Sequence, residues 1–357
     1  MNPSSTILKI SGLSKTFAGS KRAAVHDFEL EVEGGQIVAL LGESGCGKTT
    51  ILRMIAGFEV PDSGTVIIDG RELCSPKTFV EPEKRGVGIV FQDYALFPHK
   101  SVEENIAFGL FRHRRPDRKK IAQSMLELCG LQGLEKRYPH QISGGQRQRV
   151  ALARALAPKP NIILFDEPFS NIDSLRKNQM RSDIEAIIKQ AGITAIFVTH
   201  DTRDVLAMAD RVVVMSQGIS LQTGNPAEIY KRPLNQYVAR FFGKTNLLTA
   251  TPAKGGYQTP IGFLASENSH LNSSAQVMLS VRPEHWEVIS TQEEGCFSAS
   301  IISESFAGEH KEVICQVSLT DGTMERIVIY APAHLDFKSN TCLFRLNPGY
   351  EPAILES

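Results

Sequence analysis

Short apolar runs alternate with stretches of helical periodicity from residue 7 to about residue 243. This alternation is typical of an α/β domain. The apolar runs with the length of buried strands are 37–41, 87–91, 162–165, 195–199 and 211–215.

Two changes in this pattern predict further parts. Between residues 91 and 143 the chain is mostly helical and charged, which indicates an inserted helical subdomain at about 93–157. After residue 243 turn residues separate short β-type runs, such as 277–281 and 326–330. We therefore expect a nucleotide-binding domain over 1–243 and a separate β-rich domain over 244–357.

A complete G-x-x-x-x-G-K-[ST] sequence follows the run 37–41, and helical apolar spacing follows it at 51–55. This strand–loop–helix context favours a phosphate-binding loop over an ordinary glycine-rich turn. Glycines let backbone N–H groups approach phosphate, and the helix N-terminus adds partial positive charge. Lys48 would reach the β- and γ-phosphates, and Thr49 would bind Mg²⁺. The predicted nucleotide-binding residues here are Gly42, Glu43, Ser44, Gly45, Cys46, Gly47, Lys48, Thr49 and Thr50.

Two acids end the apolar run 162–165. Asp166 and Glu167 stand where a buried strand would deliver carboxylates to a phosphate site. We expect Asp166 to orient Mg²⁺, directly or through water. Glu167 would accept a proton from the attacking water, or polarise it.

A second motif, Ser143-Gly144-Gly145-Gln146, precedes a predicted helix at 147–156. It can offer backbone N–H groups, a hydroxyl and a helix N-terminus to an anion. A helix cap without a ligand is the alternative, which the other motifs disfavour.

Composition narrows the class of protein. The 357 residues include 39 Lys+Arg and 39 Asp+Glu, so no global field would draw the chain onto nucleic acid. No apolar run approaches the ~18 residues of a membrane span, and residues 1–17 lack a signal-peptide layout. We expect a cytosolic protein whose membrane contacts come through a partner. The scattered cysteines are expected to be reduced thiols without a metal.

The order of these motifs resembles that of the ATP-binding cassette ATPases of membrane transporters, over about residues 7–243. The resemblance implies a homodimer with ATP and Mg²⁺, in which each ATP lies between one subunit's phosphate loop and the other's Ser143–Gln146 motif. Ile142 departs from the family's usual leucine, an apolar exchange expected to be harmless.

Four further residues acquire roles from this resemblance alone. Gln92 resembles the glutamine that touches Mg²⁺ and the attacking water, and His200 the histidine that contacts the γ-phosphate. Asp173 resembles the aspartate that communicates between the two sites. Phe17 matches the aromatic that stacks on adenine, with a buried core position as the alternative.

The segment around Gln92-His99 and the tail stretches 225–233, 242–246 and 280–285 resemble importer ATPases at the cytoplasmic face of the bacterial inner membrane. Those subunits contact permease subunits directly and a periplasmic binding protein indirectly. Across the whole chain the resemblance is to ferric-iron importers of the Fbp type, with an oligonucleotide-fold-like regulatory domain. Polyamine, sulfate, molybdate or sugar cargo remains an alternative. A soluble cassette ATPase acting on ribosomes or DNA is disfavoured by the presence of one cassette without a long heptad insert. The tail could also sense an intracellular signal.

Overall fold

The computed structural model describes residues 5–111, 114–170, 172, 174–266, 276–293, 295–319, 323–337 and 339–356, except the side chains of 174 and 175. The chain divides into two compact units, Met1–Pro226 and Ala227–Ser357. Each unit has its own sheets, which are described in turn.

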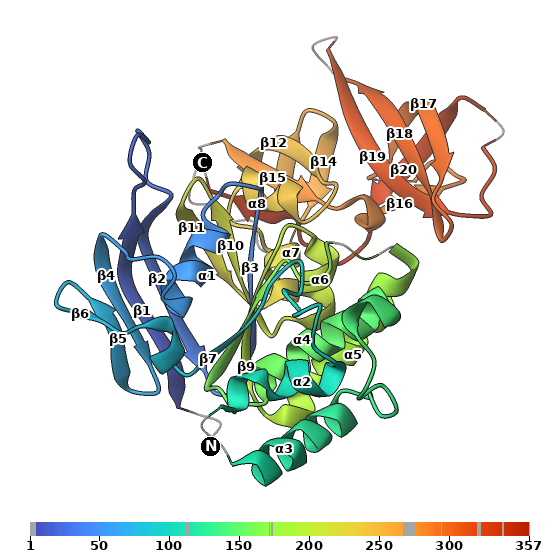
Figure 1. Ribbon diagram of the computed structural model, residues 1–357. Helices are drawn as coiled ribbons and strands as arrows, with labels where there is room; N and C mark the ends of the chain where they lie inside the picture. The colour runs from blue at the N-terminus through green and yellow to red at the C-terminus, as the bar shows by residue number, and fades with distance from the viewer. Residues whose placement is uncertain are drawn as a thin grey trace. The chain divides into compact units, whose positions relative to one another are not determined.

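A six-stranded sheet forms the centre of the first unit (Figure 1), in the order β11-β10-β3-β9-β8-β7. Its strands pair in parallel, apart from β11 at one edge. Every residue of β3 and β9 is buried. Continuous apolar runs such as these suit strands that are covered on both faces. The strands are β3 (Ile37–Gly42), β7 (Val87–Val90), β8 (Ile162–Asp166), β9 (Thr194–Thr199), β10 (Arg211–Ser216) and β11 (Ile219–Gly224).

An antiparallel sheet, in the order β2-β1-β4-β5-β6, packs with the central sheet and helix α1 (Lys48–Ala56) around one apolar core. Burial alternates along β2, as expected for a strand with one face toward the core. The strands are β1 (Thr6–Lys15), β2 (Val25–Glu33), β4 (Ser63–Ile68), β5 (Arg71–Ser75) and β6 (Thr78–Phe79).

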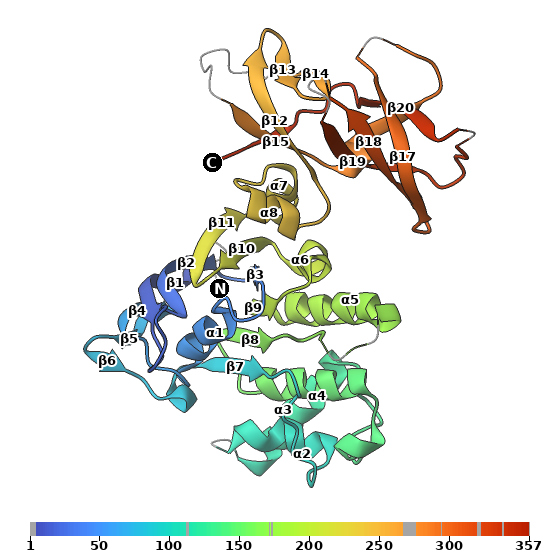
Figure 2. The ribbon, with the colours of Figure 1, turned by 90° about the horizontal axis from the view of Figure 1, so that it is seen from above.

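Helices α2 (Val102–Ala107), α3 (Arg115–Leu128) and α4 (Gly144–Leu156) pack on one another, beyond β7 in Figure 2. Short 3₁₀ turns at Phe108–Leu110 and Pro139–Gln141 flank them, and another, Pro82–Lys84, precedes β7. Helices α5 (Ser174–Ala191) and α6 (Thr202–Met208) follow β8 and β9. The α/β fold with a helical subdomain is thereby confirmed.

The second unit contains two antiparallel sheets, in the orders β14-β13-β12-β15-β21 and β16-β20-β17-β18-β19, around an apolar core that includes Trp286 and Phe344. This confirms an all-antiparallel C-terminal domain. A 3₁₀ turn, Pro283–His285, precedes β16. The strands are β12 (Asn246–Ala253), β13 (Gly256–Thr259), β14 (Gly262–Ala265), β15 (Val277–Val281), β16 (Trp286–Ile289), β17 (Phe297–Phe306), β18 (His310–Ser318), β19 (Met324–Pro332), β20 (Thr341–Leu346) and β21 (Ala353–Leu355).

The division between the units falls at Pro226 instead of near residue 243. Helices α7 (Pro226–Lys231) and α8 (Gln236–Phe241) lie with the β domain, where Arg282 contacts both of them. Its buried guanidinium donates to the carbonyl oxygens of Tyr230 and Ala239 at 3.1 and 2.8 Å. Sequence patterns placed both helices in the first domain because helical periodicity does not reveal which core a helix joins.

Candidate active site

The phosphate loop joins β3 to α1, and two of its glycines have no room for a side chain. A Cβ on Gly42 would lie 2.4 Å from the carbonyl oxygen of Met215, and one on Gly47 would lie 2.2 Å from that of Ala24. Gly47 also has a φ of 105°, in the left-handed region that favours glycine. Close approach therefore requires glycine at both positions, and at Gly47 the backbone conformation requires it as well.

Lys48 is folded into the loop that contains it. Its side chain is buried, and Nζ donates to the carbonyl oxygens of Gly42 and Glu43 at 2.7 and 2.8 Å. Nζ also lies 3.6 Å from Sγ of Cys46. Glu43, Ser44 and Gly45 are exposed, so the outer surface of the loop is open to a ligand while the ammonium group is held beneath it.

Thr49 and Asp166 bring two hard oxygen ligands together. Thr49 Oγ1 donates a 3.1 Å hydrogen bond to Asp166 Oδ1. Burial raises the pKa of the Asp166 carboxyl, and the Thr49 hydrogen bond opposes that shift. A hydroxyl and a carboxylate suit Mg²⁺, which takes few protein ligands and completes its shell with water and substrate phosphates. Among the described residues, no group of three His, Cys, Asp or Glu side chains is placed to hold a metal ion.

Glu167 and His200 lie beside these residues at the carboxyl ends of β8 and β9. His200 Nδ1 is 3.6 Å from Glu167 Oε1, and the His200 side chain is 54% exposed. Glu167 has a φ of 47°, which is unusual for a residue with a side chain. Its amide donates to the carbonyl oxygen of Val198 on β9 at 3.2 Å. The pair is thus held at the site with its imidazole open to solvent.

The Ser143–Gln146 motif is the N-terminus of α4. Ser143 Oγ accepts from the amide of Gln146 at 3.3 Å, and Gln146 Oε1 accepts from the amide of Ser143 at 2.9 Å. This capping box fixes the first turn of the helix. The motif is therefore a helix cap. Its residues also line an open cavity that a ligand could enter.

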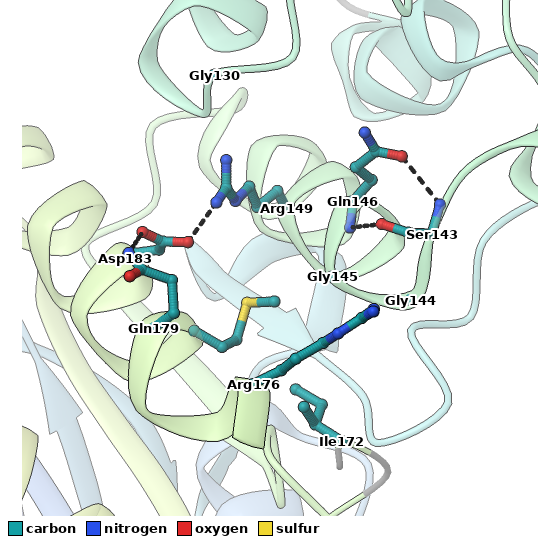
Figure 3. A pocket seen from close by; sticks show the side chains of 11 residues that line it. Gly130, Ser143, Gly144, Gly145, Gln146, Arg149, Ile172, Arg176, Gln179 and Asp183 are labelled. Atoms are coloured by element: carbon teal, nitrogen blue, oxygen red, sulfur yellow. Dashed lines mark hydrogen bonds and ion pairs between the residues drawn. The ribbon is translucent and has the colours of Figure 1, made fainter. Parts of the chain in front are cut away.

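The cavity beside this motif has a volume of about 430 Å³ (Figure 3). Its far wall comes from α5, where Gln179 Nε2 donates to Asp183 Oδ1 at 2.8 Å and Asp183 pairs with Arg149 of α4. Of the residues that the structure describes, none from the phosphate loop lines this cavity. The lining residues are Gly130, Ser143, Gly144, Gly145, Gln146, Arg149, Ile172, Arg176, Gln179, Met180 and Asp183.

Of four other predicted residues, three lie in different settings and one falls outside the described part of the chain. Phe17 is 42% exposed, so it is not a core residue, and the ammonium group of Lys15 lies 5.5 Å from its ring centre. Gln92 is exposed in the turn after β7. Thr50 is half-buried in α1, and Asp173 falls outside the described residues.

Sequence reasoning missed two buried polar groups near Glu167 and His200. Gln148 of α4 donates to the carbonyl oxygen of Pro168, directly after Glu167. Arg181 of α5 donates to Asp204 Oδ1 at 2.7 Å, and Thr199 Oγ1 donates to Asp204 Oδ2 at 2.7 Å. A polar residue at the spacing of an apolar helix face was the available signal for Gln148.

A second cavity, of about 560 Å³, has a mostly apolar lining that includes Ala95 and Phe97 of the segment expected to contact a permease. Phe91, Phe97 and Phe108 line it together with Arg154, whose Nη2 donates to the carbonyl oxygen of Tyr94 at 2.8 Å.

In the described part of the chain, no helix combines the length and the apolar character needed to cross a bilayer.

Comparison with known proteins places these features in a wider group. A profile described as ABC transporter matches residues 25–170. The spermidine/putrescine import ATP-binding protein PotA of Marinobacter nauticus is 37% identical over 328 residues, which cover 89% of this chain and 86% of that protein. The Fe(3+) ions import ATP-binding protein FbpC 2 of Rhizobium meliloti is 46% identical over 264 residues, which cover 72% of this chain and 65% of that protein.

Two solved structures resemble the chain at lower identity. The protein cbiO1 from Clostridium perfringens, part of the ABC transporter complex cbiONQ, superposes with a TM-score of 0.58 and 30% identity, covering 63% of this chain and 90% of its own. The ATP-binding cassette MJ0796, solved as a dimer in a post-hydrolysis state with ADP and Pi, has a TM-score of 0.53 and 29% identity. That match covers 62% of this chain and 99% of MJ0796.

Proposed function

This chain belongs to the ATP-binding cassette (ABC) transporter family, and we propose that it hydrolyses ATP with Mg²⁺ to drive a permease that imports a polyamine. The main support for this proposal is the arrangement of the candidate residues at one edge of the sheet. The adjacent parallel strands β3, β8 and β9 are followed at their carboxyl ends by Lys48, the Thr49–Asp166 pair and the Glu167–His200 pair. Ligands of open α/β sheets bind at this edge.

Each of these residues has a distinct task in phosphoryl transfer to water. Lys48 binds the β- and γ-phosphates by charge, and the loop amides orient them. Thr49 and Asp166 would hold Mg²⁺, with Gln92 as a further proposed ligand, and the ion would neutralise charge on the phosphates. Glu167 accepts a proton from the attacking water, and His200 stabilises charge on the γ-phosphate.

Two copies of the chain complete the site in this proposal. The Ser143–Gln146 motif presents a hydroxyl and a helix N-terminus in an open cavity that holds no phosphate-loop residue among those described. Such a surface suits the γ-phosphate of a nucleotide bound by the partner subunit. Asp173 would connect the two sites, and Phe17 would stack on adenine through its exposed ring.

The apolar cavity at Phe91, Phe97 and Phe108 is the surface where a permease segment would dock, at the cytoplasmic face of the inner membrane. Phe108 is 52% exposed, and an aromatic side chain exposed beside a cavity is typical of an interaction site. A periplasmic substrate-binding protein would reach this subunit only through the permease.

The comparisons with known proteins lead us to propose a different cargo from the one expected from the sequence. Overall similarity favoured ferric iron, but the polyamine import protein matches 89% of this chain and the ferric-ion import protein 72%. The polyamine match covers more of both proteins, 89% and 86% against 72% and 65%, which is why we propose a polyamine. Ferric iron remains the second candidate because the shorter match has the higher identity, 46% against 37%.

The change Glu167→Gln tests the catalytic part of this proposal. Loss of the base should slow ATP hydrolysis at least about 100-fold. Binding of Mg-ATP should remain, so an ATP-held dimer should accumulate in size-exclusion chromatography. A variant that stays monomeric and hydrolyses ATP normally would remove Glu167 from the mechanism.

Uptake by cells tests the cargo. Deleting the gene should abolish high-affinity uptake of labelled spermidine and putrescine, and the wild-type chain should restore it whereas Glu167→Gln should not. Loss of Fe³⁺ uptake with normal polyamine uptake would replace the polyamine by iron.

A further inference from the structure

A buried side chain of α4 reaches the catalytic loop of the same subunit. Gln148 follows the Ser143–Gln146 motif on this helix and is fully buried. Its Nε2 donates a 2.9 Å hydrogen bond to the carbonyl oxygen of Pro168. Pro168 comes directly after Glu167. The helix that carries the motif is therefore tied to the backbone beside the proposed base.

The backbone at Glu167 needs such support. Its φ of 47° lies in the left-handed region, where a residue with a side chain persists only if its surroundings fix it. The amide of Glu167 donates to Val198 of β9 at 3.2 Å, and Ser170 Oγ donates to the Glu167 carbonyl oxygen at 3.0 Å. The Gln148 bond adds a restraint from α4, so the position of α4 contributes to where the Glu167 carboxylate lies.

Packing does not explain why this position carries an amide. Oε1 of Gln148 is buried and has no hydrogen-bond partner among the described residues. An unpaired buried acceptor lowers the stability of a fold, and a methionine of similar volume would avoid that cost. What the amide provides is the bond to Pro168.

We propose that Gln148 is a positioning residue that couples the two nucleotide half-sites carried by one chain. When the Ser143–Gln146 motif binds the partner's nucleotide, α4 moves as a unit because its first turn is fixed by the capping box. Gln148 passes that movement to Pro168 and sets the Glu167 carboxylate for hydrolysis of the subunit's own nucleotide. The inference rests on the proposed function, which assigns the motif to the partner's ATP.

The variant Gln148→Met removes the bond and keeps the volume. Hydrolysis by the full-length protein should fall about 10- to 100-fold in kcat, because a small displacement of a catalytic group has effects of this order. KM for ATP and the Kd for Mg-ATP should stay at wild-type values, since the phosphate loop is unchanged. The thermal unfolding midpoint should also stay near wild type, because the unpaired Oε1 of Gln148 disappears while the Pro168 carbonyl oxygen loses its donor, and these two effects oppose each other.

Leu156→Ala provides the matched control. Leu156 is a buried residue at the opposite end of α4 from the motif. Its truncation should lower the unfolding midpoint and leave kcat per folded molecule unchanged. If Gln148→Met only loosened the helix, the two variants would show the same pattern, and the proposal would be overturned.

A double-mutant cycle with Ser143→Ala tests the coupling itself. In the wild-type background Ser143→Ala should reduce kcat strongly. In the Gln148→Met background, the fold reduction in kcat caused by Ser143→Ala should be at least several-fold smaller. Fully additive effects, or a Gln148→Met enzyme with wild-type kcat, would overturn the role of Gln148. If wild-type protein shows no hydrolysis sensitive to Glu167→Gln, the proposed function fails first, so the two failures are distinguishable.

Discussion

Lys48 and Phe17 belong to the same proposed nucleotide site but occupy opposite environments. Lys48 is 4% exposed and bonded to loop carbonyl oxygens, whereas Phe17 is 42% exposed. The ammonium group contributes a charge that nothing else in the loop replaces, whereas the ring contributes only a stacking surface. The two residues should therefore differ in what their loss does to the enzyme.

We expect Lys48→Ala to abolish ATP hydrolysis and Phe17→Ala to weaken ATP affinity while retaining it. Stacking contributes about 0.5–1.5 kcal/mol beyond the buried area, which corresponds to roughly a 2- to 13-fold rise in Kd. Fluorescent-nucleotide titration and steady-state kinetics measure both effects. Equal, small changes in KM for the two variants would contradict the site.

The six cysteines are free thiols with different accessibility. Burial raises the pKa of Cys129 to about 12, whereas Cys296 is partly exposed. At pH 8 only about one Cys129 thiol in 10⁴ would be ionised, and the thiolate is the reactive form. Iodoacetamide should label Cys296 in the folded protein and Cys129 only after denaturation. Labelling of Cys129 at native conditions, detected by mass spectrometry, would contradict its burial.

Helix α5 is joined to the segment around His200 by a buried ion pair. Arg181 and Asp204 are 5% and 3% exposed, and their closest atoms are 2.5 Å apart. Asp204 also accepts from Thr199, which precedes His200. A buried pair of this kind is costly to break, because the remaining partner is left as an uncompensated charge.

Arg181→Met should therefore lower the free energy of unfolding by about 3–5 kcal/mol. Arg203→Met is the matched control: Arg203 also pairs with an aspartate, Asp201, but its side chain is 72% exposed, so its loss should cost about 1 kcal/mol or less. Urea denaturation followed by circular dichroism compares them. Similar losses for both variants would show that the Arg181 pair is not effectively desolvated.

At the scale of the whole molecule, the proposed nucleotide site and the C-terminal β domain belong to two different compact units. All residues proposed to bind ATP lie in Met1–Pro226, and Ala227–Ser357 contains its own core. The guanidinium of the buried Arg282 donates hydrogen bonds to the carbonyl oxygens of residues 230 and 239. Both residues precede β12, the first strand of the second unit. The guanidinium carbon of Arg282 also lies 4.2 Å from the centre of the Tyr230 ring, which adds a cation–π contact. Arg282 thus connects α7 and α8 to the β domain.

Fragments cut at two positions test this boundary. Residues 1–226 should fold and bind Mg-ATP, and residues 227–357 should fold as a separate domain. The shorter fragment 244–357 lacks three of the four carbonyl partners of Arg282 and the packing of α7 and α8, so it should be less stable than 227–357. Equal stability of the two C-terminal fragments would place the boundary near residue 243.

Local patterns determined much of this protein without reference to its fold. The apolar runs predicted the central strands because a strand buried on both faces must be continuously apolar. The phosphate loop could be located because its glycines are required by backbone geometry wherever the motif occurs, as the close approaches at Gly42 and Gly47 show. The chemistry of Asp166 and Glu167 followed from their position at the end of such a run.

Other properties depended on contacts between residues distant in the sequence. The alignment of Thr49 with Asp166, and of Glu167 with His200, arises from the strand order β3-β9-β8, which hydrophobic periodicity does not specify. The bond from Gln148 to Pro168 and the attachment of α7 and α8 by Arg282 arise in the same way. A buried polar side chain takes its role from the partner that folding brings to it, and only the tertiary structure decides which partner that is.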